Sequence, residues 1–131
     1  MPVVVTAAET PLGRRVVRRL LADGAEVRAV VDKPAGDLGV PTSRADWDDA
    51  ERLGAVMEGA HTVIHLAGRK RVRALLEAVD DTSVVRIVST VQVEWPVRGS
   101  GEFVWVEVPR WRPDLDAVAD ALVEADRREC H

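Results

Sequence analysis

The sequence predicts an α/β fold of the Rossmann type: a mainly parallel sheet of about five strands with helices on both faces. Short β-branched segments alternate with amphipathic helical segments along the chain. The first pair, Val3–Leu21, has the strand–turn–helix order that opens a nucleotide-binding α/β domain. Asp32 ends the second predicted strand, about 20 residues after Gly13, where such domains hydrogen-bond an adenosine ribose. A solvated loop aspartate is the alternative for Asp32.

The first predicted strand is Val3–Ala7. Thr10 is the predicted N-cap of the helix that follows, and Pro11 its first residue, because proline suits that position. The helix is expected to end near Gly24, which can take the left-handed C-cap conformation. The apolar face of this helix consists of Leu12, Val16, Val17, Leu20 and Leu21.

The later elements continue the same alternation. The predicted strands are Glu26–Val31, Pro41–Ala45, Thr62–Leu66 and Val84–Thr90. The predicted helices are Asp48–Glu58, Arg71–Val79 and Leu115–Ala125. This order favours a parallel sheet with helices on both faces.

The pattern changes after the fifth predicted strand. Val91–Trp95 and Phe103–Val108 both alternate, and no helix fits between Thr90 and Glu102. We therefore expect an antiparallel hairpin that turns at Gly99–Gly101, with a parallel final strand as the alternative. An uncovered apolar face on this hairpin predicts a homodimer through the hairpin and the last helix.

Length and composition narrow the class of protein. The 131 residues suit one domain, 1–131, and the net charge of -4 argues against nucleic acid as a partner. The single cysteine, Cys130, fits the reducing cytoplasm, where we expect the protein. No apolar run is long enough to span a bilayer, so no membrane association is expected.

Six segments in order carry a family resemblance. Three hold the most informative motifs: TAAETPLG at Thr6–Gly13, RADWDD at Arg44–Asp49 and VIHLAG at Val63–Gly68. The other three are RALLEAV at Arg73–Val79, VVRIVST at Val84–Thr90 and DLDAVADALVEA at Asp114–Ala125. The chain resembles a reduced member of the extended and atypical short-chain dehydrogenases/reductases, which include NAD-dependent epimerases and NmrA-like proteins.

The resemblance implies NAD(P) as the cofactor. Thr6–Gly13 lies where the family has TGxxGxxG, and Asp46 matches the family aspartate that faces the adenine. Thr90 falls where the family keeps a catalytic serine or threonine. The cofactor-binding residues expected on this basis are Ala7, Thr10, Leu12, Gly13, Asp32, Asp46 and Trp47.

The departures from the family bear on activity. Ala7 and Thr10 replace the first two glycines, and Glu9 brings a negative charge to the helix N-terminus, where a phosphate should lie. A carboxylate can stabilise that terminus without a ligand. The catalytic tyrosine of the family is missing, since the chain contains no tyrosine. We expect NAD(P) to bind weakly or not at all.

Two further residues are catalytic candidates, but neither has a predicted partner. Thr90 has no tyrosine or lysine to activate it, and we interpret it as a strand-end hydroxyl. His65 is better explained as a satisfied core or cleft histidine, and with His61 it forms no metal pair. No metal site is predicted.

Two groups of side chains leave alternatives open. Four basic residues follow the fourth strand and suit either a solvated helix start or a small anion site: Arg69, Lys70, Arg71 and Arg73. The four tryptophans suit a core or dimer interface, or else an apolar ligand pocket: Trp47, Trp95, Trp105 and Trp111.

These observations favour a non-redox binding, regulatory or scaffold protein with a nucleotide or another small molecule as its ligand. The alternatives are a small cofactor-independent enzyme of the cyclase or isomerase type and an atypical NAD(P)-dependent reductase.

Overall fold

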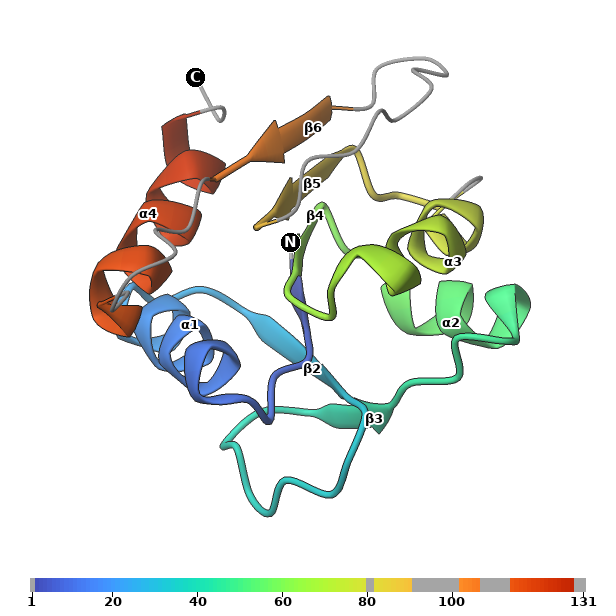
Figure 1. Cartoon of the computed structure of the whole chain (residues 1–131), viewed down its shortest axis with the longest axis horizontal. Coiled ribbons are helices and arrows are strands. Elements are labelled where there is room, and N and C mark those ends of the chain that lie inside the picture. Colours follow the sequence, from blue (N-terminus) through green and yellow to red (C-terminus); the bar gives the residue numbers. More distant parts are fainter. Residues whose placement is uncertain (1, 80–81, 91–101, 107–113, 129–131) are drawn as a thin grey trace.

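A computed structural model describes residues 2–79, 82–90, 102–106 and 114–128. Strands and helices alternate along the chain (Figure 1). The strands are β1 (Val3–Thr6), β2 (Val27–Val31), β3 (Thr42–Arg44), β4 (Thr62–His65), β5 (Arg86–Ser89) and β6 (Glu102–Trp105). The helices are α1 (Pro11–Ala22), α2 (Ala50–Met57), α3 (Arg69–Val79) and α4 (Leu115–Arg128).

The described strands form one parallel sheet in the order β3-β2-β1-β4-β5-β6. Because β1 lies between β2 and β4, the strand order reverses there, and open α/β sheets bind ligands at the carboxyl ends of the strands beside such a reversal. The predicted Rossmann-like α/β fold is confirmed. We call the carboxyl ends of β1, β2 and β4, with the loops that follow them, the carboxyl edge.

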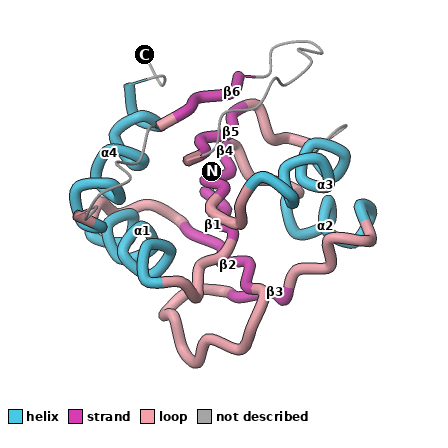
Figure 2. Tube along the Cα trace, viewed as in Figure 1, coloured by secondary structure: helices cyan, strands magenta, loops and turns pink. Residues whose placement is uncertain are grey.

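The sheet separates two hydrophobic cores. On one face α1 and α4 pack side by side (Figures 1 and 2). Val16 and Leu20 of α1, which contacts β1 and β2, and Leu122 of α4, which contacts β5, are buried in one cluster. On the other face α2 and α3 bury Leu53, Met57 and Leu75. Helices therefore cover both faces, as the alternating pattern predicts.

The first helix follows the prediction closely. Thr10 caps it, Pro11 is its first residue, and Gly24 takes a φ of 79° just beyond its end. Val16, Val17 and Leu20 are buried, but Leu21 is 42% exposed. Leu21 lies at the border of the apolar stripe, so the face that the sequence predicts is one residue too wide.

The antiparallel arrangement expected for the last strand is wrong. β6 pairs with β5 in parallel, with Arg86 opposite Glu102 and Ser89 opposite Trp105. A parallel β6 requires a connection long enough to return to the other end of β5, but that connection does not have to contain a helix. The 12 residues from 90 to 101 can span roughly 40 Å when extended, whereas a strand of four residues covers only about 13 Å. The predicted strand Val91–Trp95 and the turn Gly99–Gly101 lie outside the described residues.

A buried ion pair fastens α4 to the sheet at the edge opposite the carboxyl edge. The Nη1 of Arg86, a residue 5% exposed, donates to Oδ1 of Asp126 at 2.9 Å, and Thr62 Oγ1 donates to the same oxygen at 2.8 Å. The helix that closes the chain is thus tied to β4 and β5. Among the described helices, none has both the length and the apolar run that a bilayer crossing requires.

Candidate functional site

The turn after β1 keeps two local features of a dinucleotide-binding turn. Ala7 has a φ of +50°, a left-handed conformation that glycine adopts at lower cost. Gly13 is required by close packing, because a Cβ there would lie 2.3 Å from the Ala7 carbonyl oxygen and 2.6 Å from the Ala8 Cα. This matches the third family glycine, which allows the helix to approach the strand closely.

Most of the hydrogen-bond donors of this turn are used within the protein. Thr10 Oγ1 accepts from the Gly13 amide at 3.0 Å and donates to the Ala7 carbonyl at 2.7 Å. The Thr10 amide also donates to the Ala7 carbonyl, at 3.1 Å, and Pro11 has no N–H. In the part of the chain that the structure describes, Leu12 retains a first-turn amide without an acceptor.

Glu9 reaches across the carboxyl edge to β2. Its Oε1 accepts a hydrogen bond of 2.9 Å from the Asp32 amide, and its Oε2 is buried with no hydrogen-bond partner among the described residues. We expected the Glu9 charge at the N-terminus of α1, and the structure corrects this. The carboxylate satisfies the free amide beyond the end of β2 instead.

The Arg14 side chain binds the backbone carbonyl of Glu9. Its Nε donates to the Glu9 carbonyl at 3.0 Å and its Nη2 donates to the Ala35 carbonyl at 2.9 Å. One guanidinium therefore joins the turn after β1 to the loop after β2, and it limits the movement of both.

Asp32 lies where the sequence predicts it, just beyond β2, and it is half-buried. Its Oδ1 accepts a short hydrogen bond, 2.6 Å, from Nε1 of Trp47. Trp47 also lies edge-on to the His65 ring, with 5.8 Å between ring centroids, and the Arg71 guanidinium lies 5.7 Å from its ring centroid. Trp47 therefore lies half-buried at the carboxyl edge, where it packs against the rim of the core beneath α2 and α3.

His65 is fully buried, and both its ring nitrogens have partners. Nε2 lies 3.0 Å from the Gly68 carbonyl, which can only accept, so the proton is on Nε2. Nδ1 then accepts from Thr6 Oγ1 at 3.0 Å, and that hydroxyl accepts from the Leu66 amide at 2.9 Å. Burial lowers the pKa of His65 from 6.5 and outweighs the Gly68 hydrogen bond and the Asp32 charge, which raise it.

The structure brings some of the predicted site residues together and leaves others apart. A continuous set of contacts links Asp32, Trp47 and His65. Thr10 lies in the adjoining turn, next to Glu9, which bonds the Asp32 amide. Asp46 Oδ1 instead accepts from the Asp48 amide, in a turn before α2. Thr90 is half-buried just after β5, two strands away from β1.

The other candidates have structural explanations. His61 bonds Thr62 at the start of β4, so it lies at the opposite end of this strand from His65. The basic residues at the start of α3 are exposed, as a solvated helix start requires. In the described ranges, no three His, Cys, Asp or Glu side chains are grouped to hold a metal ion. Trp95 and Trp111 lie outside the described residues.

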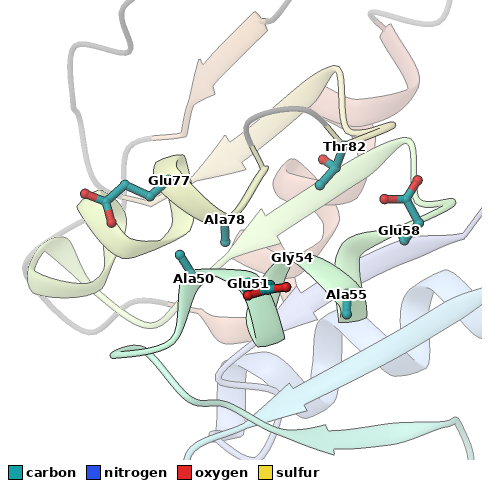
Figure 3. Close-up of a pocket in the computed structure, with 8 residues that line it drawn as sticks. All are labelled: Ala50, Glu51, Gly54, Ala55, Glu58, Glu77, Ala78 and Thr82. Atoms are coloured by element: carbon teal, nitrogen blue, oxygen red, sulfur yellow. The ribbon is translucent and has the colours of Figure 1, made fainter.

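A hollow of about 570 Å³ lies between α2 and α3, away from the carboxyl edge (Figure 3). The hollow does not extend deeper between the two helices, because they pack closely beneath it. A Cβ at Gly54 would lie 2.8 Å from the Ala78 carbonyl oxygen. The lining residues are Ala50, Glu51, Gly54, Ala55, Glu58, Glu77, Ala78 and Thr82. None of them belongs to the network around Asp32.

The turn at the carboxyl edge leaves few backbone donors free for a dinucleotide. A pyrophosphate on this turn needs backbone N–H groups that point outward. Here the Gly13 and Thr10 amides have internal acceptors, Pro11 supplies none, and the Asp32 amide is bonded to Glu9. Among these groups of the described chain, the Leu12 amide alone is left without an internal acceptor, and one donor does not fit a bound pyrophosphate.

Sequence reasoning missed three contributors to this site. The role of Thr6 could be found from its polar side chain in an otherwise apolar strand, since a buried hydroxyl needs partners. The partner of Glu9 and the Ala35 carbonyl bound by Arg14 left no signal, because these contacts join residues 23 and 21 positions apart. The other Arg14 contact, to the Glu9 carbonyl, spans five positions.

Comparison with protein families identifies a matching family. Residues 8–128 match the family described as NAD(P)H-binding. A comparison with curated proteins finds no match.

Solved structures share the fold at low sequence identity. An NADPH-dependent quinone oxidoreductase from Escherichia coli is 18% identical, with a TM-score of 0.60 over 98% of this chain and 42% of its own. A short-chain dehydrogenase/reductase superfamily protein from Agrobacterium tumefaciens, solved with bound NAD, is 20% identical, with a TM-score of 0.60 over 98% and 45%. Vestitone reductase from alfalfa is 19% identical, with a TM-score of 0.57 over 67% and 35%. The chain spans less than half the length of these three proteins.

Proposed function

The chain belongs to the NAD(P)H-binding family, and from this premise we propose that it is a non-redox member whose carboxyl edge binds a ligand for regulation rather than for hydride transfer. The resemblance to short-chain dehydrogenases/reductases is confirmed at the level of family and fold. The observation that carries the proposal is the internal use of the turn: the amides of Gly13 and Asp32 bond to Thr10 and Glu9.

The lack of the tyrosine that the family uses as its catalytic residue supports a non-redox function. The chain contains no tyrosine, and Thr90 has no described base in contact with it. His65 cannot accept a proton from a substrate without breaking its bond to Thr6, because both ring nitrogens are occupied. The neutral ring therefore acts as a bridge between β1 and the loop after β4.

The hydrogen bonds that link the loops of the carboxyl edge support a binding function. The hydrogen bond from Trp47 to Asp32 joins the segment before α2 to the end of β2. Arg14 joins the turn after β1 to the loop after β2. Asp32 presents a carboxylate that can accept from ribose hydroxyls and disfavours a phosphate on the same ribose. A nucleotide or a small molecule with hydroxyl donors is the ligand class that we propose.

The experiment is an assay of NADH and NADPH oxidation with a panel of aldehydes, ketones and quinones. We expect no oxidation above the rate without protein. Turnover that is abolished by Thr90→Val would show that the protein uses the family chemistry and would contradict the proposal. Ser83→Ala is the control, since this hydroxyl bonds Ala60 before β4 and lies far from the carboxyl edge.

A further inference from the structure

We infer that Glu9 is an internal competitor for the ligand at the carboxyl edge, an inference that rests on the function proposed above. Its carboxylate occupies the Asp32 amide, which lies at the end of β2 where a bound nucleotide places its ribose. A ligand must displace Glu9 to use this amide. Glu9 thereby sets both the affinity of the site and the class of nucleotide that it accepts.

The geometry favours a displaceable contact over a permanent one. Glu9 Oε1 has the Asp32 amide as its partner at 2.9 Å, but Oε2 is buried and has no partner among the described residues. A buried carboxylate oxygen without a donor is destabilising. The closed position is therefore incompletely satisfied, and a ligand that takes over the amide lets Glu9 return to solvent.

The backbone beneath Glu9 is fixed, so the side chain is the part that can move. Arg14 holds the Glu9 carbonyl at 3.0 Å and the Ala35 carbonyl at 2.9 Å, which ties down both loops around the site. The Thr10 amide and hydroxyl both bond the Ala7 carbonyl. Rotation of the Glu9 side chain opens the Asp32 amide without any change in this backbone.

The charges around the Asp32 amide define the ligand class. The Glu9 carboxylate accepts from the Asp32 amide, so it lies close to the Asp32 carboxylate. Trp47 donates to one oxygen of that Asp32 carboxylate. Two negative charges at one point repel a phosphate, whereas ribose hydroxyls can donate to them. The site therefore selects nucleotides with an unsubstituted ribose over those with a 2′-phosphate.

The test compares the unaltered protein with Glu9→Ala, Glu9→Gln and Glu77→Ala in calorimetric titrations with NADH, NADPH and AMP. Glu77→Ala is the charge-matched control, because Glu77 is exposed on α3. Glu9→Ala should tighten NADH and AMP binding about tenfold. Glu9→Gln should tighten it less, because an amide oxygen can still accept from Asp32. Glu77→Ala should leave binding unchanged.

A second readout needs no ligand. Hydrogen exchange at the Asp32 amide should become about tenfold faster in Glu9→Ala than in the unaltered protein. The inference is overturned if folded Glu9→Ala binds NADH and AMP as the unaltered protein does, or if Asp32 exchange does not change. Because Glu9→Ala also removes one of the two charges that repel a 2′-phosphate, NADPH should gain at least as much as NADH, and a smaller gain for NADPH overturns the inference too. None of these results depends on turnover, so the non-redox proposal stands or falls separately.

Discussion

The hydroxyl of Thr6 donates a 3.0 Å hydrogen bond to Nδ1 of His65, and it joins residues 59 positions apart at the carboxyl ends of two neighbouring strands. The same hydroxyl accepts from the Leu66 amide, and the other ring nitrogen donates to the Gly68 carbonyl. The neutral imidazole therefore fixes the start of the loop that leads into α3. A protonated ring carries a hydrogen on both nitrogens. The Nε2 hydrogen keeps its acceptor, the Gly68 carbonyl, but the Nδ1 hydrogen would face the Thr6 hydroxyl, which donates to this nitrogen.

We predict that the stability of the protein falls as the pH falls below 6.5. The pKa of His65 is lowered in the folded state, chiefly by burial, so the unfolded chain binds the proton at a higher pH. The stabilising contribution is complete above pH 6.5 and is lost as the pH falls through the folded pKa. Urea unfolding between pH 5 and pH 8 measures this slope, with roughly one proton taken up on unfolding.

His65→Gln should remove this part of the slope, and it should lower the free energy of unfolding at pH 8 by about 1 to 3 kcal/mol because Thr6 and Gly68 lose a matched partner. His61→Gln is the control and should keep the slope that His65 causes. A His65 ring that titrates at or above 6.5 in the folded protein, as followed by NMR, would show that this explanation is wrong.

Gly13→Ala should destabilise the protein by about 2 to 3 kcal/mol, because the added Cβ would lie 2.3 Å from a backbone oxygen and 2.6 Å from a backbone carbon. Neither atom is the end of a flexible side chain that can move aside. Gly24→Ala is the matched control. It has a φ of +79° with no atom within 4 Å of the Cβ, so it should cost only about 1 kcal/mol of conformational strain. Equal losses in the two variants would refute the packing explanation.

We propose that two copies associate along β6 and α4. β6 pairs with β5 and forms one edge of the described sheet, and an edge strand leaves backbone N–H and C=O groups available to another chain. Val104 and Val106 pack partly against the core beside α4, so we place the contact along the strand edge. Light scattering at tens of micromolar should give the mass of a dimer, and Trp105→Lys should give a monomer. A monomeric unaltered protein would exclude the association.

Local sequence signals were sufficient for most of the fold. Thr10 and Pro11 mark the start of α1 because a hydroxyl cap and a missing N–H suit the first turn, and Gly24 marks its end through a left-handed φ. The β-branched residues of β1, β4 and β5 are fully buried between two helical layers, so these strands appear as short apolar runs.

Contacts between distant residues could not be predicted in the same way. The direction of β6 depends on a 12-residue connection whose length permits either arrangement. The bonds from Glu9 to Asp32 and from Trp47 to Asp32 depend on the packing of two loops that no local pattern relates. Asp32 itself was predictable, because its place after a strand is set by the fold; the partners that occupy it were not.

The measurement that tests the central claim most directly is a calorimetric titration of the unaltered protein and of Ala7→Gly/Glu9→Ala/Thr10→Gly with NADH and NADPH. Because Thr10 and Glu9 use the amides that a dinucleotide needs, the unaltered protein should bind both weakly or not at all. The triple variant should bind NADH on the order of a hundredfold more tightly, as two charge-assisted contacts become available. Micromolar affinity in the unaltered protein would contradict the claim that this turn is satisfied internally.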